Sequence, residues 1–383
     1  MDQETIAIWI EPNYAETPWC HKLFDGIKAE LTRRRCKALI NTSEEPTEGI
    51  VQNGIVIIAG ETNGWIERMI SIAHASNMRI CVACADPETV LPNASTVTLD
   101  RWGDMCTMIR YFCDAGRRRI ALFGVNPASP ADQKRIEGYQ DMVKSLQLDL
   151  SQEDIYPTYG DVQACSAKLL FHIGRYDAII AGNDLYAIYL MPLLIKAGYS
   201  IPDQLYIAGF GNTYLSRCVS PSLTTAALDH AELGRQAIHS AFHLEKNPQV
   251  SRLSTTVEGR FFPRASTAFR PVTTGSATRA TSRIRSEISS YTDCHLSQVV
   301  NLEMCLAGCD AMDLAIVEEL KKVQSVNAIA DKLYLSQSSL NYRLNKLYHQ
   351  ASVASRQEFE KLLNLYAANF TVDAVRSAGE IKL

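Results

Sequence analysis

The chain has 383 residues, enough for more than one domain, and 46% of them are hydrophobic and 21% charged, as in an ordinary soluble protein. The formal net charge is only −4, so any contact with nucleic acid has to come from a local basic patch. Apolar stretches are of strand length, such as Ile55–Ala59, and predict neither a transmembrane helix nor a membrane partner. The first residues lack a basic and a long apolar region, so we expect no secretory signal and a cytoplasmic location.

The eleven cysteines raise the question of metal binding or disulfides. Cys81 and Cys84 have zinc-like spacing, but no second pair or nearby histidine completes a ligand set. Reduced cytosolic thiols, with no metal and no cofactor, are the simpler interpretation. The sequence has no phosphate loop, nucleophile elbow or His-Glu-x-x-His helix, and we expect His230, His239 and His243 on an exposed or half-buried helix face. These features predict a protein that is not an enzyme, with a nucleotide- or sugar-modifying α/β enzyme as an alternative.

Short apolar runs alternate with amphipathic helical patterns from Thr5 to about Lys246. The expected strands are residues 6–10, 55–59, 80–83, 120–123, 178–181 and 206–209. The expected helices are residues 19–31, 66–75, 105–115, 135–146, 186–197 and 233–244. This alternation is typical of parallel sheets covered on both faces, and the strands are too many for one sheet. We therefore expect two doubly wound α/β subdomains, with a closing pair of strands within residues 252–264.

Several ordered motifs of this region stand at strand ends, where open α/β sheets bind ligands. They are residues 115–124, 135–139 (Arg-Ile-Glu-Gly-Tyr), 181–187 (Ala-Gly-Asn-Asp-Leu-Tyr-Ala), 207–212 (Ile-Ala-Gly-Phe-Gly-Asn) and 220–225. Together they resemble the effector-binding domain of the LacI/GalR repressors, which is similar in fold to periplasmic sugar-binding proteins. The resemblance runs from about residue 6 to residue 269 and implies a type I periplasmic-binding-protein-like fold.

The resemblance also implies ligand contacts. Arg135 matches the family arginine that reaches the ligand, where a guanidinium can clamp hydroxyls or a carboxylate; an ion pair with Asp132 or Glu137 is the alternative. Asn183 and Asp184 match the Asn-Asp pair of the family. Asn183 offers a donor and an acceptor to the ligand, whereas Asp184 either contacts the ligand or caps the following helix.

Aromatic residues and one departure from the family complete the expected pocket. Trp19 falls at the family's first-helix aromatic, where it either stacks on a sugar or base or packs in the core. Tyr14 and Trp102 are further candidates in cleft loops. The family's Gly-Phe-Asp-Asp or Gly-Tyr-Asp-Asp is Gly209-Phe-Gly-Asn212 here, which keeps Asn212 but removes a carboxylate that accepts hydrogen bonds from sugar hydroxyls. We therefore expect a sugar acid, a modified sugar or another small polar effector ahead of a plain hexose.

The composition changes after Pro271. Residues 273–282 are rich in Thr, Ser, Gly and Ala, and no acid occurs before Glu287 among several arginines. This is typical of a linker, whose arginines either keep it soluble or add phosphate contacts. We therefore expect a sensor domain over residues 1–270, an Arg/Ser/Thr-rich linker over 271–287, a connecting helix over 288–312 and a small all-α domain over 313–383. The sensor and the all-α domain are expected to be independently stable.

Residues 326–346 have the pattern of a helix-turn-helix. Apolar residues recur at helical spacing on both sides of a break, at Ile329, Ala330, Leu333, Leu340, Leu344 and Leu347. Ser336 supplies an N-cap hydroxyl for the second helix. Its outer face carries side chains that can bind base edges or phosphates, namely Ser338, Ser339, Asn341, Tyr342, Arg343, Asn345 and Lys346. Because no acid occurs from residue 332 to residue 357, the pattern favours DNA binding over an ordinary helical hairpin.

The same segment resembles the LuxR-type DNA-binding domain. In that family the recognition helix is followed by a Val-x-Ser-Arg-x-Glu-type turn and a further helix. Here the turn is Val353-Ala-Ser-Arg-Gln-Glu358, and the apolar stripe of the following helix is Phe359, Leu362, Leu363 and Tyr366. The expected first helix, residues 313–322, lacks the usual Thr-x-Arg-Glu opening.

These patterns together predict a ligand-responsive transcription regulator. An effector between the subdomains would change hinge closure, and with it the geometry of two DNA-reading domains in a homodimer. In LacI-type repressors the helix-turn-helix precedes the sensor, whereas here the resembling segment follows it. The alternative is a solute- or sugar-binding protein without a DNA function, which the missing secretory signal and the extra C-terminal domain disfavour.

Overall fold

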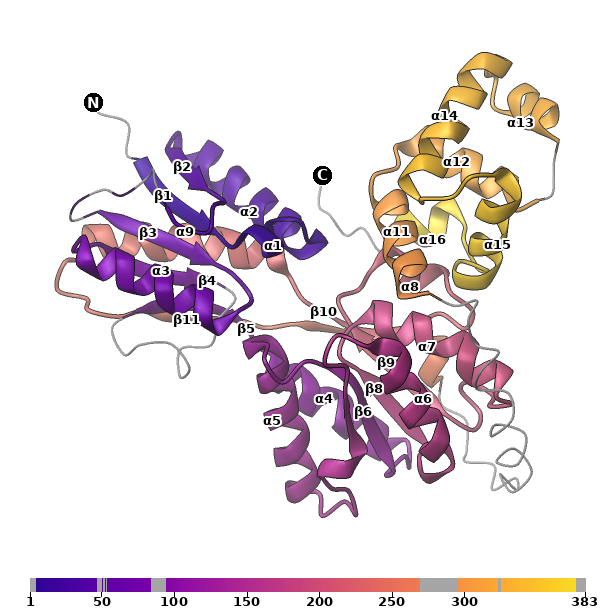
Figure 1. Ribbon diagram of the computed structural model, residues 1–383, viewed down its shortest axis with the longest axis horizontal. Coiled ribbons are helices and arrows are strands. Elements are labelled where there is room, and N and C mark those ends of the chain that lie inside the picture. Colours follow the sequence, from indigo (N-terminus) through magenta and orange to yellow (C-terminus); the bar gives the residue numbers. More distant parts are fainter. Residues whose placement is uncertain are drawn as a thin grey trace. The chain divides into compact units, whose positions relative to one another are not determined.

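The computed structural model describes residues 5–46, 50, 52, 54–83, 94–268, 295–322 and 325–376. The chain forms two compact units (Figure 1). Unit 1 comprises Met1–Thr107, Asn126–Met142 and Leu228–Arg260, and unit 2 comprises Met108–Val125, Val143–Ala227 and Phe261–Leu383. Each contains a six-stranded sheet with helices packed on it, so the predicted α/β class with two subdomains is confirmed.

The sheet of unit 1 has the strand order β11-β5-β4-β3-β1-β2, and its pairings are parallel. The strands are β1 (Thr5–Ile10), β2 (Lys37–Asn41), β3 (Ile55–Ala59), β4 (Arg79–Ala83), β5 (Ser95–Leu99) and β11 (Ser254–Val257). The helices packed on them or following them are α1 (Pro12–Ala15), α2 (Pro18–Arg34), α3 (Asn63–Ala75) and α9 (His230–Lys246). In addition, α4 (Arg101–Asp114) and α5 (Pro130–Ser145) begin in unit 1.

Alternate residues of each strand of unit 1 face opposite helix layers. Trp9, Val56 and Ile58 form one apolar cluster with Trp65 and other buried residues of α3. On the other side α2 and α9 lie against each other (Figure 1). Their close contact needs glycine, because a Cβ at Gly26 or at Gly234 would overlap the backbone of the other helix.

The sheet of unit 2 has the order β12-β10-β9-β8-β6-β7. Its strands are β6 (Ile120–Val125), β7 (Ile155–Pro157), β8 (Ala178–Ala181), β9 (Tyr206–Phe210), β10 (Thr224–Ala227) and β12 (Arg260–Phe262). The helices are α6 (Val162–His172), α7 (Asp184–Lys196) and α8 (Tyr214–Cys218), with short 3-10 turns at Gln152–Asp154, Ile173–Arg175 and Ala265–Thr267. The two strands predicted within residues 252–264 are present, but each ends a different sheet: β11 pairs with β5, and β12 lies next to β10.

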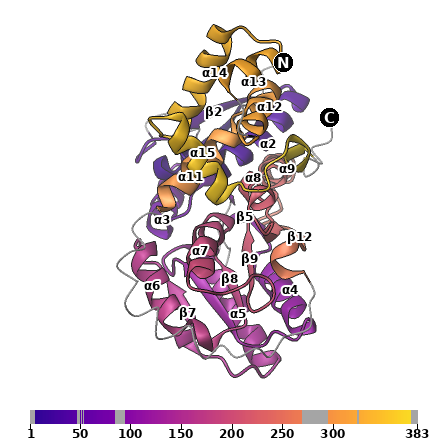
Figure 2. The same ribbon diagram turned by 90° about the vertical axis from the view of Figure 1, so that its right-hand side faces the viewer.

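The C-terminal helices belong to unit 2. They are α11 (Leu296–Ala307), α12 (Ala311–Leu320), α13 (Val326–Lys332), α14 (Gln337–Gln350), α15 (Arg356–Tyr366) and α16 (Val372–Arg376). Both α11 and α15 contact α7 (Figure 2), and α16 contacts α8 (Figure 1). One continuous hydrophobic core therefore runs from Leu193 and Leu215 of the α/β part to Leu302 and Tyr366. The predicted linker, residues 271–287, lies outside the described residues.

Two further findings apply to the described residues. No helix among them is long and apolar enough to cross a membrane. No group of three or more His, Cys, Asp or Glu side chains among them is arranged to hold a metal ion. Of the pair noted in the sequence, Cys81 is buried in β4 and Cys84 lies outside the described residues.

Candidate ligand pocket and helix-turn-helix surface

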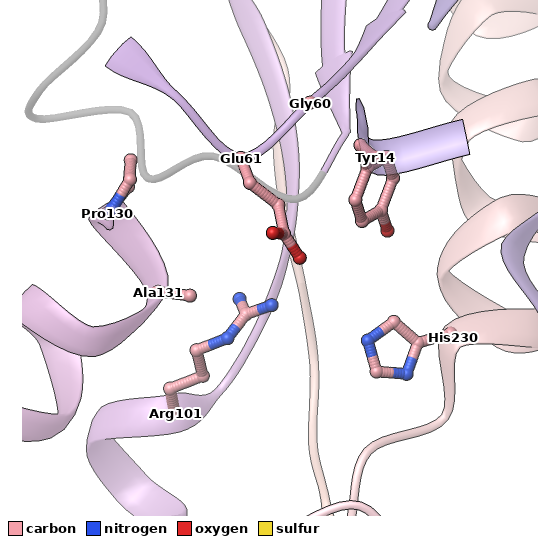
Figure 3. A pocket seen from close by; sticks show the side chains of 7 residues that line it. All are labelled: Tyr14, Gly60, Glu61, Arg101, Pro130, Ala131 and His230. Carbon is pink, nitrogen blue, oxygen red and sulfur yellow. The ribbon is translucent and has the colours of Figure 1, made fainter. Parts of the chain in front are cut away.

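A small pocket lies in unit 1, where strands end and helices begin (Figure 3). Its empty volume, open mouth included, is about 270 Å³. It is lined by Tyr14, Gly60, Glu61, Arg101, Pro130, Ala131 and His230. Tyr14 follows β1, Gly60 follows β3 and Arg101 follows β5 by one residue, so the pocket stands at the carboxyl ends of parallel strands. Ligands bind at this edge in open α/β sheets.

Arg101 is the most unusual residue of the pocket. It is the first residue of α4, and only 7% of its surface is exposed. Its guanidinium points into the pocket toward Glu61 (Figure 3). Across the described part of the chain no hydrogen-bond or ion-pair partner of this guanidinium is found, and Nε is fully buried. The sequence prediction missed Arg101 because β5, the strand that places it, was not recognised.

Glu61 is positioned by its neighbour Glu11. The buried Glu11 carboxylate accepts hydrogen bonds from the backbone amides of Glu61 and Thr62, at 2.6 and 3.1 Å, and from the Thr62 hydroxyl at 2.5 Å. Glu61 as a residue is exposed, but its carboxyl end points into the pocket (Figure 3). Desolvation there raises the pKa of Glu61, and the charge of Arg101 opposes this shift.

His230 begins α9 and is buried, with 5% of its surface exposed. The expectation of an exposed or half-buried position is therefore wrong for His230. Its Nδ1 lies 3.0 Å from the carbonyl oxygen of Leu228, which assigns the proton to Nδ1 and leaves Nε2 as an acceptor. Burial lowers the pKa of His230 to about 3, and the nearby charge of Arg101 acts in the same direction, so the ring is neutral at pH 7.

The three aromatic residues that the sequence suggested for the pocket, Tyr14, Trp19 and Trp102, differ in their positions relative to it. Tyr14 is buried and lines the pocket. Trp19 is half-buried and stacks on His230, with a centroid distance of 5.6 Å and an interplanar angle of 26°, so it touches a pocket residue rather than lining the pocket. Trp102 is exposed, and its Nε1 donates to Asp141 Oδ2 at 2.9 Å, so its ring is held outside the lining.

Arg135 does not line the pocket. Its Nη1 lies 2.6 Å from Asp132 Oδ1 on the same helix, and the side chain is buried. The ion pair considered as the alternative is thus what the structure contains. Burial lowers the pKa of Arg135, and the Asp132 charge opposes this change. An arginine already balanced by a half-buried carboxylate is a weaker ligand clamp than the sequence implied.

Asn183 and Asp184 belong to unit 2, and their expected roles are corrected. Asn183 caps α7, because its Oδ1 accepts a hydrogen bond from the backbone amide of Tyr186 at 2.9 Å. Asp184 is fully buried and accepts hydrogen bonds from the Thr225 hydroxyl at 2.6 Å and from Thr213 N and Oγ1 at 2.8 and 3.2 Å. Asp184 is therefore neither the cap nor open to a ligand; it joins the segments after β8 and β9 to β10.

Asn212 lies in the same region of unit 2, with φ of +47°. Its Oδ1 accepts a hydrogen bond from Arg264 Nη2 at 2.5 Å, and its carbonyl oxygen accepts one from Arg217 Nη2 at 3.3 Å. Burial lowers the pKa of Arg264 to about 10. Asn212 was expected to bind the ligand, and its side-chain oxygen is already engaged by a partly buried arginine.

The predicted helix-turn-helix is present as α13 and α14. The connection from Leu333 to Ser336 contains Tyr334 in the left-handed region, with φ of +55°. As predicted, the Ser336 hydroxyl caps α14, accepting from Ser339 N at 3.2 Å. The apolar stripe Leu340, Leu344 and Leu347 is buried. Four of the predicted DNA-contacting side chains are exposed, namely Ser338, Asn341, Tyr342 and Asn345, and Ser339 is half-exposed.

The two basic residues of the α14 face are engaged by acids of α12. Arg343 Nη1 lies 2.8 Å from Asp310 Oδ2 and 2.6 Å from Asp313 Oδ1, and Lys346 Nζ lies 2.8 Å from Asp313 Oδ2. Hydrogen bonds to these carboxylates raise the pKa of both Arg343 and Lys346. The sequence between residues 332 and 357 is free of acids, but the fold brings two acids to it. Arg343 and Lys346 are thus only half-exposed.

A wider depression in unit 2 is lined by arginines and is a weaker candidate. Arg119 pairs with Asp177 at 3.2 Å, and Arg175 pairs with the buried Asp154 at 3.3 Å. Arg119 and Arg175 are both exposed to solvent, and the depression is more open than the pocket of unit 1. Two of its arginines are already paired, so we assign no ligand to it.

Comparisons with known proteins agree with this fold. Residues 109–267 match the family described as a periplasmic binding protein-like domain. The match covers less than half of the chain, from within α4 to the 3-10 turn after β12. The chain is 32% identical over 162 residues to the ribose operon repressor of Escherichia coli K12, an alignment that covers 40% of this chain and 48% of that protein. It is 24% identical over 249 residues to the transcriptional repressor PurR of Mannheimia succiniciproducens, covering 62% and 74%. The chain spans about half the length of the ribose operon repressors it matches.

Solved structures show the same fold at low sequence identity. The transcriptional regulator CelR in complex with cellobiose superposes with a TM-score of 0.60 at 17% identity, over 68% of this chain and 84% of that one. A LacI family transcriptional regulator from Enterococcus faecium with bound ribose gives 0.55 at 20% identity, over 70% and 100%. The α/β part of the chain therefore has the type I periplasmic-binding-protein fold that the sequence predicted.

Proposed function

We propose that the chain is a ligand-responsive transcription regulator, in which a small polar effector bound in the pocket of unit 1 controls DNA binding by α13 and α14. The observation that carries this proposal is the joining, in one chain, of a periplasmic-binding-protein-like domain with a polar pocket and a capped helix-turn-helix. The relatives are named as repressors, which supports a regulator and disfavours an enzyme.

DNA recognition is assigned to the exposed face of α14. Asn341 and Tyr342 project from it, and 74% of the Tyr342 surface is exposed. An amide side chain can bind adenine through two hydrogen bonds, and a tyrosine hydroxyl can donate to a phosphate. Together with the turn at residues 353–358 and the buried stripe of α15, these features support a LuxR-type DNA-binding domain.

The regulator is proposed to act as a cytoplasmic homodimer. A pair of reading helices can bind two half-sites, and the spacing of those half-sites follows from the geometry of the dimer. An effector changes DNA binding if it favours one of two arrangements of the chain, so it need not touch the reading helices.

The test begins with selection of DNA from a random pool by the full chain, followed by fluorescence anisotropy on the selected sequence. A double variant, Asn341→Ala with Tyr342→Ala, should lose sequence-specific binding by roughly ten-fold or more, since good base contacts contribute about 1–3 kcal/mol each. Asn364→Ala, at an exposed position of α15, is the matched control and should bind like the native chain. Failure to enrich any sequence would overturn the DNA-binding proposal.

A second candidate is a ligand-binding protein without a DNA function. The observation that favours it is the engagement of Arg343 and Lys346 by Asp310 and Asp313, which lowers the positive charge offered to phosphates. Ligand binding by a chain that enriches no DNA sequence would decide for this candidate.

A further inference from the structure

We propose that the pocket of unit 1 selects a polyhydroxy carboxylate, such as a sugar acid, and that Arg101 binds its carboxylate group. This inference rests on the proposed function only in taking this pocket as the effector site. It replaces Arg135 with Arg101 as the residue that determines specificity.

The first argument is the state of Arg101. A guanidinium that is more than nine-tenths buried is costly unless a partner balances its charge and accepts its hydrogen bonds. Arg101 has no hydrogen-bond or close ion-pair partner among the described residues, and it is aimed into the pocket (Figure 3). The charges of Glu61 and Asp104 act on it only from a greater distance. A ligand carboxylate at this position would supply the bidentate acceptor that the guanidinium lacks, in addition to the charges of Glu61 and Asp104.

Neighbouring arginine Arg135 provides the contrast. Its charge is balanced by Asp132 at 2.6 Å, so a ligand would have to displace a buried ion pair to use it. A ligand that binds Arg101 displaces no such ion pair. The energetically accessible anion site is therefore the one at Arg101.

The second argument is the convergence of helix N-termini. The helices α4, α5 and α9 have 14, 16 and 17 residues, and their first residues, Arg101, Pro130 and His230, all line the pocket. Each helix N-terminus carries a partial positive charge, which favours an anion. The Gly103 amide of α4 and the Glu232 amide of α9 already donate to the capping residues Asp100 and Asp229. The dipoles add to the Arg101 charge within one small volume.

The third argument concerns the remaining polar groups, which are acceptors. His230 Nε2 accepts because Nδ1 holds the proton, and the Glu61 carboxylate accepts as well. Both require donors on the ligand. A bare inorganic anion has no donors and would meet Glu61 with like charge. A neutral sugar would leave the guanidinium of Arg101 without a charged bidentate acceptor. A molecule with a carboxylate at one end and hydroxyls at the other satisfies all three groups.

The lining of the pocket also has an aromatic part. Tyr14 adds an aromatic surface beside the polar groups (Figure 3).

The experiment compares matched acids and neutral sugars on the full chain. Thermal shift and calorimetry are run with D-glucuronate against D-glucose, D-galacturonate against D-galactose and D-gluconate against D-glucitol. We expect at least one acid to raise the melting temperature more than its neutral partner. In Arg101→Gln this acid should bind roughly ten- to a hundred-fold more weakly, because a charge-assisted bidentate contact is lost.

Three further variants serve as controls for the effect of Arg101→Gln on acid binding. Arg68→Gln removes an exposed arginine that pairs with Glu44 at 3.2 Å and should leave acid binding unchanged. Arg101→Lys keeps the charge but not the fork, and should retain part of the preference for the acid. If Arg101→Gln does not fold, Arg101→Lys and Glu61→Gln serve instead: the first should weaken acid binding, whereas the second should keep the acid preferred over its neutral partner.

Several outcomes would overturn the assignment. They are equal shifts with an acid and its neutral partner, no shift with any of the acids, and an acid preference that survives unchanged in Arg101→Gln. Tight binding of a neutral sugar would remove the acid selection and leave the regulator proposal intact. Conversely, failure to bind DNA would leave the assignment of Arg101 untouched.

Discussion

The carboxylate of Glu303 on α11 accepts hydrogen bonds from the backbone amides of Tyr214 and Leu215 at 2.9 Å each. A buried side chain of the C-terminal region thus binds the first turn of α8, directly after the loop that follows β9. The same loop contains Thr213, whose amide and hydroxyl donate to the buried Asp184. On its other side α11 packs against α14, with Cys305 Sγ within 3.5 Å of the Leu347 carbonyl oxygen. Helix α11 therefore connects the α/β part to the reading helix α14, through hydrogen bonds on one side and apolar packing on the other.

Replacing Glu303 by Gln should destabilise unit 2 by about 2 kcal/mol, because charge-assisted bonds to two buried amides are weakened. Urea denaturation monitored by circular dichroism measures the change. Glu153→Gln, at an exposed position of unit 2, is the control and should be neutral. A midpoint for Glu303→Gln equal to that of the native chain would show that this carboxylate contributes nothing to the joint.

Truncation before the linker tests the shared core. The sequence predicted a sensor over residues 1–270 that is stable by itself, whereas the core of unit 2 runs into α11 and α15. A chain ending at residue 270 would expose Leu193 and Leu215, so we expect a lower melting temperature than for the full chain and binding of a hydrophobic dye. A truncated protein that melts like the full chain, without dye binding, would restore the original expectation.

Arg135→Ala should affect folding more than the sequence implied. With the guanidinium gone, Asp132 remains as an uncompensated and mostly buried charge, and breaking such a pair costs roughly 3–5 kcal/mol. A double-mutant cycle with Asp132→Asn measures the coupling directly in urea. The double variant should be less destabilised than the sum of the single ones. Additive losses would mean that the two charges do not interact appreciably.

The elements that could be predicted from the sequence are those whose formation depends on neighbouring residues in the chain. Strand β3 was predicted with its observed bounds, since residues 55–59 are an unbroken apolar run after a glycine. By contrast, β10 reads Thr-Thr-Ala-Ala and is a strand because β9 pairs with it, which no local pattern shows. Helix α14 was predicted together with its cap because both signals are local.

Site residues were harder to predict because their roles depend on partners distant in the sequence. Asn183 and Asp184 are adjacent, and the position at which α7 begins determines their roles. Asn183 caps the helix, and Asp184 is buried against Thr213 and Thr225. The burial of Arg101 and His230 follows from helix starts that meet only in the folded unit. Tyr14 was found because it follows a strand that the sequence shows plainly.

His230 should make stability depend on pH. Its pKa is about 3 in the folded chain against an ordinary value of 6.5, so between these values the unfolded chain binds a proton that the folded chain does not. Stability is therefore lost as pH falls through this window, with a slope of up to about 1.4 kcal/mol per pH unit. His230→Asn should flatten the slope, as measured by urea denaturation at a series of pH values.

The comparison with a control variant is needed because Asp104 acts in the opposite direction. Burial raises the pKa of Asp104 to about 7 from an ordinary 3.8, so its contribution falls as pH rises through that window. Asp104 is present in every variant, so its contribution to the slope of stability against pH cancels when the slopes of two variants are compared. His243→Asn, which replaces an exposed histidine of the same helix, should keep the native slope. An unchanged slope in His230→Asn would mean that the ring is protonated in the folded chain.

The acids of α12 should limit the affinity of the reading helix for DNA. Asp310 pairs with Arg343 and caps α12 through Asp313 N at 2.8 Å. Asp310→Asn keeps a good capping residue while it removes one negative charge beside α14. We expect tighter DNA binding and a salt dependence steeper by up to about one unit of log K against log salt, since only Asp313 then competes with a phosphate for Arg343. Fluorescence anisotropy at several salt concentrations measures both quantities.

The opposite change completes the test. Lys346→Ala should make the salt dependence shallower by about one unit if Lys346 exchanges Asp313 for a phosphate in the complex. Part of its effect will be on folding, because Asp313 is fully buried and keeps only Arg343 as a charged partner. Melting temperatures of both variants separate this contribution from binding. If the salt dependence is the same in the native chain, in Asp310→Asn and in Lys346→Ala, these ion pairs persist on DNA and the contacts of α14 come from its uncharged side chains.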